Sequence, residues 1–202
     1  FENVITKYRE NHIPIDMLYM DIDYMKDYKD FTINNDNFPD FEGFVKDMKS
    51  KNIHLIPIID AGVKIEDGYD VYEEGKKGAY FCKREDGTDF EAAVWPGLTH
   101  FPDVLNEDAR AWFGSKYEKL VEKGIDGFWN DMCEPAIFYT PEGVEEYKEY
   151  LQKELLTCEV FPAFDAKTKA AELANSPKDY RRFYHNVNGT MIRHDKVHNL
   201  YG

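Results

Sequence analysis

The sequence Gly127-Phe128-Trp129-Asn130-Asp131-Met132-Cys133-Glu134-Pro135 decides the fold prediction. A run of good helix formers, residues 109–123, precedes it and ends at a glycine suited to a helix C-cap. A short apolar segment, residues 125–129, follows, and the carboxylates Asp131 and Glu134 come where that segment stops. Helix, turn, buried strand and polar strand end make up a β/α unit, in which functional side chains sit at the carboxyl ends of the strands.

Two earlier segments follow the same pattern of an apolar strand that ends in acids. Residues 15–25 are predicted as a strand whose end carries Asp21 and Asp23, on one face if the strand stays regular. Residues 53–60 are apolar almost throughout, as expected of a parallel strand buried on both sides, and end in Asp60. Helices are predicted over residues 2–12, 41–50 and 109–123. Strands and helices in alternation predict a parallel α/β fold.

The remaining segments interrupt this alternation. Residues 63–102 form a long connection, and a β-hairpin is predicted within it at residues 81–90, around Asp86-Gly87. A connection of this length in a compact domain is usually functional. Residues 140–194 depart from the β/α pattern, apart from a predicted helix over 142–156, and are interpreted as an insertion.

Charge and cysteine content limit the possible partners. The net charge is −14, from 25 basic and 39 acidic residues, which argues against a nucleic acid or an anionic membrane as partner. No apolar run has the length of a membrane helix. Cys82, Cys133 and Cys158 are an odd number without metal-ligand spacing, which favours thiols in a reducing compartment and predicts a cytoplasmic location.

The central stretch resembles the nucleophile motif of glycoside hydrolase family 31, the retaining α-glucosidases and their relatives. The family pattern reads Trp-x-Asp-Met-Asn-Glu, which Trp129, Asp131, Met132 and Glu134 match, whereas Cys133 stands where the family usually has Asn. Further marks of the family occur in the expected order: Ile13-Pro14, Asp21-Ile22-Asp23-Tyr24-Met25, Pro57-Ile58-Ile59-Asp60, Trp95-Pro96-Gly97, Phe101-Pro102-Asp103 and His198-Asn199-Leu200-Tyr201-Gly202. The resemblance covers roughly residues 4–139 and the last few residues.

The resemblance implies part of a (β/α)8 TIM barrel, about strands 2 to 4 with their helices, plus an insertion after the third strand present. The corresponding divisions are residues 1–139 for the partial catalytic barrel, 140–194 for the insertion and 195–202 for the start of the next barrel helix. The family's general acid/base, an Asp after the sixth strand, is expected outside this sequence. The rest of the barrel is therefore an expected partner.

The resemblance also assigns roles to individual residues. It implies that Asp131 is the nucleophile of a retaining hydrolysis and that Asp21 accepts hydrogen bonds from sugar hydroxyls. The expected substrate is an oligosaccharide with terminal α-linked glucose. The apolar and aromatic walls of the sugar site are expected from Ile22, Ile58, Trp95, Trp129 and Met132. Glu134 is expected to hold the loop through backbone donors. No cofactor and no metal are implied.

Other interpretations of these residues remain open at this point. An α-xylosidase of the same family is the first alternative. The Asp21-x-Asp23 pair is also the pattern of a metal-dependent sugar transferase, although the sequence shows no basic phosphate-binding cluster. A non-catalytic carbohydrate-binding module is a third possibility. Strand-end acids also act as helix caps, and strand-end Trp and Ile residues often serve packing alone.

Overall fold

The computed structural model describes residues 1–157 and 176–201, the side chains of 154–157 excepted. The chain forms two compact units. The first unit consists of residues 1–61 and 114–131, and the second of residues 62–113 and the described residues from 132 onward. No helix of the described residues is long and apolar enough to cross a membrane.

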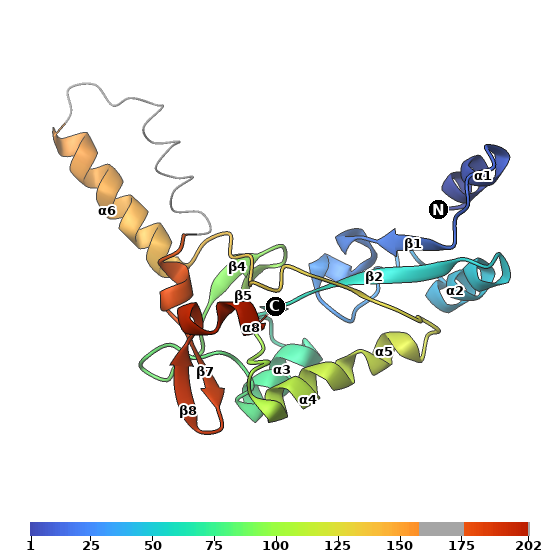
Figure 1. The fold of residues 1–202 in the computed structure, drawn as a ribbon. Coiled ribbons are helices and arrows are strands. Elements are labelled where there is room, and N and C mark those ends of the chain that lie inside the picture. Colours follow the sequence, from blue (N-terminus) through green and yellow to red (C-terminus); the bar gives the residue numbers. More distant parts are fainter. Residues whose placement is uncertain (158–175, 202) are drawn as a thin grey trace. The chain divides into compact units, whose positions relative to one another are not determined.

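A three-stranded parallel sheet is the centre of the first unit (Figure 1). Its strands are β1 (Met17–Met20), β2 (His54–Asp60) and β6 (Trp129–Asp131), in the order β1-β2-β6. β1 pairs with the first half of β2, and β6 pairs with its last three residues. Three parallel strands with helices between them confirm the predicted α/β fold.

The helices of this unit are α1 (Glu2–Glu10), α2 (Phe41–Ser50) and α5 (Glu118–Val121). The predicted helix over 41–50 is confirmed by α2. Asp40 caps this helix by accepting a hydrogen bond from the Gly43 N–H at 2.9 Å. Phe41, Val45 and Met48 form its buried face.

The predicted strand over residues 15–25 is wrong in its second half. β1 ends at Met20, and two 3-10 helices follow, η1 (Ile22–Tyr24) and η2 (Lys26–Tyr28). Asp21 caps η1 by accepting a hydrogen bond from the Ile22 N–H at 2.8 Å. Asp23 is therefore inside a helical turn, and a strand face shared with Asp21 does not exist.

The helix predicted over residues 109–123 is divided. α4 (Glu107–Lys116) and the short α5 replace it, with Tyr117 between them. The strand predicted to begin at residue 125 begins only at Trp129, so that Asp131 is the last residue of β6 rather than a loop residue beyond it.

The second unit contains an antiparallel sheet and several short elements. The strands β3 (Val63–Lys64), β5 (Gly97–His100) and β4 (Ala92–Val94) lie in that order. The remaining elements are α3 (Asp70–Gly78), α6 (Pro141–Thr157), η3 (Asp179–Arg181), the hairpin of β7 (Tyr184–Val187) and β8 (Thr190–Arg193), η4 (His194–Lys196) and α8 (His198–Tyr201). The turn predicted around Asp86-Gly87 is confirmed by a φ of 85° at Gly87 and a β-bridge between Lys83 and Asp89.

Aromatic rings fill the core of the second unit. Phe90 stacks on Phe183 with ring centroids 4.4 Å apart, and Tyr80 stacks on Trp112 at 5.2 Å. Trp112 is 8% exposed. Stacked and edge-on aromatic pairs contribute beyond their buried area, so these rings give the short elements of this unit a common core.

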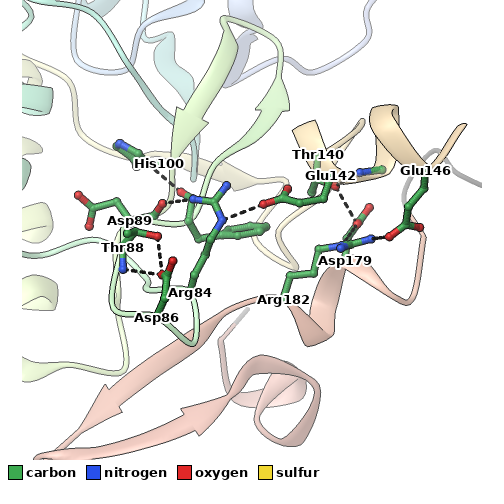
Figure 2. A network of polar contacts seen from close by, with 12 residues as sticks. Arg84, Asp86, Thr88, Asp89, His100, Thr140, Glu142, Glu146, Asp179 and Arg182 are labelled. Carbon is green, nitrogen blue, oxygen red and sulfur yellow. Dashed lines mark hydrogen bonds and ion pairs between the residues drawn. The ribbon is translucent and has the colours of Figure 1, made fainter. Parts of the chain in front are cut away.

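Polar contacts fasten α6 to two loops of the same unit (Figure 2). Arg84 donates to Glu142 at 2.8 Å, and Arg182 donates to Glu146 at 2.5 Å and to Asp179 at 2.8 Å. The bounds of α6 confirm the predicted helix over 142–156. The boundaries of the predicted insertion and of the predicted last barrel helix stay predictions, and residues 158–175, Cys158 included, lie outside the described residues.

Candidate active site

Three acids gather at the carboxyl end of the parallel sheet in the first unit. Asp60 and Asp131 are the last residues of β2 and β6 and are partners in register. Residues paired in register point to the same side of a sheet, so both side chains occupy one face. Asp21 follows the end of β1 with an extended backbone (φ −75°, ψ 179°), which keeps it in phase with Tyr19 on that same face.

Apolar and aromatic side chains lie on this face one step below the acids. Ile58 and Trp129 are partners in register, two residues before Asp60 and Asp131. The Trp129 ring meets the Tyr19 ring edge-on, with centroids 6.0 Å apart and an angle of 86°. The structure therefore brings together four of the predicted site residues: Asp21, Ile58, Trp129 and Asp131.

Asp21 serves two purposes in this position. It is exposed, and its Oδ1 accepts the hydrogen bond from Ile22 N–H that starts η1. This bond fixes the carboxylate at the sheet end, while no bond from a described residue to Oδ2 is present. Ile22 is half-buried beside it. A capping acid held in this way can still accept hydrogen bonds from hydroxyl groups of a ligand.

Asp60 is the member of this group that the sequence did not single out as a site residue. Its side chain is buried, with the residue 2% exposed, and neither carboxyl oxygen has a hydrogen-bond partner among the described residues. Burial and the charges of Asp131 and Asp21 raise its pKa to about 7. The signals in the sequence were its place at the end of an apolar strand and in the family mark Pro57-Ile58-Ile59-Asp60, neither of which assigned it a role.

Two tyrosines support the strand ends from within the unit. Tyr24 is buried and donates a hydrogen bond to the Ile58 carbonyl at 2.8 Å, and burial together with Asp30 and Asp60 raises its pKa. Tyr117 donates to Asn130 Oδ1 at 2.6 Å, and its ring meets Phe128 edge-on at 4.7 Å. These contacts hold β2 and β6 close to where their acids emerge.

The other predicted site residues belong to the second unit. Trp95 is 49% exposed in the two-residue turn between β4 and β5, edge-on to Phe138 at 5.1 Å. Met132 follows the nucleophile candidate with a φ of 55°, and Glu134 is exposed. The expected roles of these three residues stay predictions.

A buried chain of polar groups in the second unit was not foreseen. Asp103 Oδ1 lies 2.7 Å from His185 Nδ1, and Asp103 Oδ2 accepts a hydrogen bond from the Asn186 N–H at 2.7 Å. His185 Nε2 lies 2.9 Å from His194 Nδ1, and His194 Nε2 lies 2.9 Å from His198 Nδ1. The partners are up to 83 residues apart in sequence, so no local spacing announces the chain.

The Asp103 end of this series of hydrogen-bonded side chains has the atom types of a metal site. Ligand atoms of Cys82, Asp103 and His185 lie within 4.8 Å of one another, and all three residues are buried. Burial, followed by the charge of Asp103, raises the pKa of the Cys82 thiol well above its usual value, which favours the protonated thiol over the thiolate that metals bind. Burial and the neighbouring rings of His185 and His198 lower the pKa of His194 to about 3, so that ring is neutral. The arrangement is consistent with an internal hydrogen-bond chain.

Comparisons with known proteins agree with this geometry. A family model described as the glycosyl hydrolases family 31 TIM-barrel domain matches residues 1–202. Alpha-glucosidase 2 of Bacillus thermoamyloliquefaciens is 43% identical over 129 residues, which is 64% of this chain and 16% of that protein. The alpha-glucosidase of Saccharolobus solfataricus is 28% identical over 184 residues, 91% of this chain and 24% of that protein.

Solved structures give the same result. The ER glucosidase II complex of a catalytic subunit with the binding domain of a regulatory subunit matches with a TM-score of 0.71 and 28% identity. The match covers 100% of this chain and 18% of the matched chain. The 202 residues thus span less than a quarter of the length of these relatives. Because the family model extends over all of its residues, and the sheet end carries the acids expected of it, the chain belongs to the TIM-barrel domain of glycosyl hydrolase family 31.

Proposed function

We propose that the protein that carries this chain removes terminal non-reducing α-linked glucose from oligosaccharides, with retention of configuration and with Asp131 as nucleophile. The observation that carries this proposal is the position of Asp131, which ends β6 on the face shared by Asp21 and Trp129. The relatives named alpha-glucosidase support the substrate class. The cytoplasmic location remains a prediction.

The chemistry follows from a carboxylate at a strand end. Ionised Asp131 attacks the anomeric carbon, the bond to the leaving oxygen breaks, and a second carboxyl about 5–5.5 Å away protonates that oxygen. This proton donor is predicted outside the 202 residues. Water then attacks the anomeric carbon of the glycosyl ester, which returns Asp131 to its carboxylate and gives a product of unchanged configuration.

The neighbours of Asp131 suit a sugar ring in this reaction. The Asp21 carboxylate can accept hydrogen bonds from two adjacent hydroxyl groups, while the edge-on pair of Tyr19 and Trp129 offers an aromatic surface to the apolar face of the sugar. Orientation by such contacts is what turns binding energy into rate, because the reacting atoms must be held in near-attack geometry.

A covalent label tests the assignment. A slow-leaving 5-fluoro-α-glucosyl fluoride is expected to label the protein that carries this chain, and peptide mapping is expected to place the label between Phe128 and Pro135. Asp131→Asn keeps the shape of the side chain and removes the nucleophilic charge, so it should abolish labelling. Asp23→Asn, which changes an exposed acid of η1 outside the proposed site, should leave labelling unchanged.

The stereochemistry and the sugar provide independent checks. NMR of the first product is expected to show the α anomer, and β-configured sugar would overturn the retaining mechanism. A higher kcat/KM for an aryl α-xyloside than for the matching α-glucoside would assign the protein as an α-xylosidase instead. A label on a residue outside 128–135 would overturn the role of Asp131.

A further inference from the structure

Asp60 is an acid whose surroundings do not suit a charged carboxylate. Its two oxygens are buried and without a hydrogen-bond partner among the described residues. An ionised carboxylate taken out of water is costly unless hydrogen bonds or a cation compensate it. The group avoids this cost by keeping its proton.

The groups that surround Asp60 add to the same tendency. Asp131 is its partner in register on β6, and adjacent strands lie only about 4.8 Å apart. Asp21 acts on it from the end of β1, and Asp30, in the segment after η2, accepts a hydrogen bond from the Asp60 N–H at 3.1 Å. Tyr24 on η1 faces Asp30 and Asp60 as well. Among these groups, the charges of Asp131 and Asp21 disfavour a negative charge on Asp60.

We propose that Asp60 is a positioning residue that keeps its proton below neutral pH, so that Asp131 carries the negative charge of the pair beside a neutral acid. The inference rests on the proposed function, since it gives the nucleophile a partner within this chain. Two adjacent carboxyls that share a site do not both ionise readily, so the proton held by Asp60 leaves the charge on Asp131. A neutral neighbour does not repel the Asp131 carboxylate, which can then keep the geometry that attack on the anomeric carbon requires.

This role has a consequence in the pH range where Asp60 ionises. The pKa of Asp60 is about 7, so above this pH Asp60 gains a charge that repels Asp131 at the neighbouring strand end. Glycosyl transfer to Asp131 should therefore slow on the alkaline side. A merely structural Asp60 would affect stability but would not impose an ionisation on the rate of this single step.

The experiment measures the rate of covalent labelling against pH in the protein that carries this chain. The probe is 5-fluoro-α-glucosyl fluoride, because fluoride leaves without help from a proton donor, and the rate then reports on the nucleophile and its neighbours rather than on the general acid. The wild type is expected to label at a constant rate between about pH 5 and pH 6, and to approach a tenfold decrease for each pH unit well above 7. Asp60→Asn is neutral at every pH, so its rate should stay level through pH 8.5.

Two further variants complete the test. Asp60→Ala is also neutral at every pH, so it should likewise show no alkaline decrease; it replaces Asp60→Asn if that variant does not fold. Asp23→Asn, an exposed acid outside the proposed site, should keep the wild-type profile. Equal profiles for wild type and a neutral Asp60 variant, with the label still on Asp131, would overturn the role of Asp60 alone. A label on another residue would overturn both proposals, because Asp60 would then have no nucleophile to position.

Discussion

The substitution Asp60→Asn should remove the pH dependence of stability that Asp60 gives to the wild type. The folded-state pKa of Asp60 is about 7, whereas an unfolded Asp titrates near 3.9. The folded state therefore binds one more proton than the unfolded state between these values. This contribution to stability is fully present below about pH 4 and is lost as the pH rises through 7.

The magnitude follows from the width of that window. Between the two pKa values, each pH unit lowers the free energy of unfolding by about 1.36 kcal/mol. From pH 5 to pH 8 the wild type therefore loses up to about 3 kcal/mol through Asp60 alone, because the loss levels off above the folded-state pKa. Asn cannot titrate and loses nothing. Any constant cost of burying its amide cancels in the comparison, because only the difference between the two pH values counts.

Urea unfolding followed by circular dichroism at pH 5 and pH 8 measures this difference. The gap between variant and wild type should shift by about 3 kcal/mol in favour of Asn on going to pH 8. The exposed Asp23→Asn provides the matched control and should show a gap that does not depend on pH. Stability curves for Asp60→Asn and wild type that run parallel across this range would refute the buried, protonated acid.

Three further predictions concern other parts of the chain. Asp103→Asn should destabilise the second unit by about 2–3 kcal/mol in thermal or urea unfolding, because it removes the charged acceptor of the Asn186 N–H and of the His185 ring. Glycosidase activity should survive EDTA; a loss that added Mn²⁺ restores would revive the metal-dependent transferase. Cys133→Asn should be close to neutral for kcat because it restores the usual family residue, and a fall in kcat for Cys133→Ser as deep as for Asp131→Asn would contradict Asp131 as nucleophile.

Local signals in the sequence were sufficient for several elements of the fold. The helix α2 was predicted with both of its ends, since apolar residues at helical spacing lie within residues 41–50. Gly124 adopts the left-handed conformation (φ 97°) that its place after a helix predicted. The place of Trp129 and Asp131 on a strand after a helix and a turn also follows from the sequence order, although β6 is shorter than the apolar run and only half-buried.

Other features depend on contacts between distant residues and had no local signal. The prediction of one long strand through residue 25 failed because the Asp21 side chain starts a 3-10 helix, a competition between side chain and backbone that apolar periodicity does not reveal. The separation of α4 from α5 coincides with Tyr117, whose ring packs on Phe31 and Phe128. The perturbation of Asp60 arises from the strand register that places Asp131 beside it, and the chain from Asp103 to His198 depends on a contact between residues 82 positions apart, Asp103 and His185.

The distribution of the three tryptophans supplies the chain with built-in optical reporters. Trp129 belongs to the first unit, whereas Trp112 and Trp95 belong to the second, one 8% and the other 49% exposed. Indole emission shifts to shorter wavelength in an apolar environment, and collisional quenchers reach exposed rings first. Acrylamide should therefore quench Trp95 before Trp112, and Phe substitutions that leave one tryptophan at a time would follow the melting of each unit separately by fluorescence.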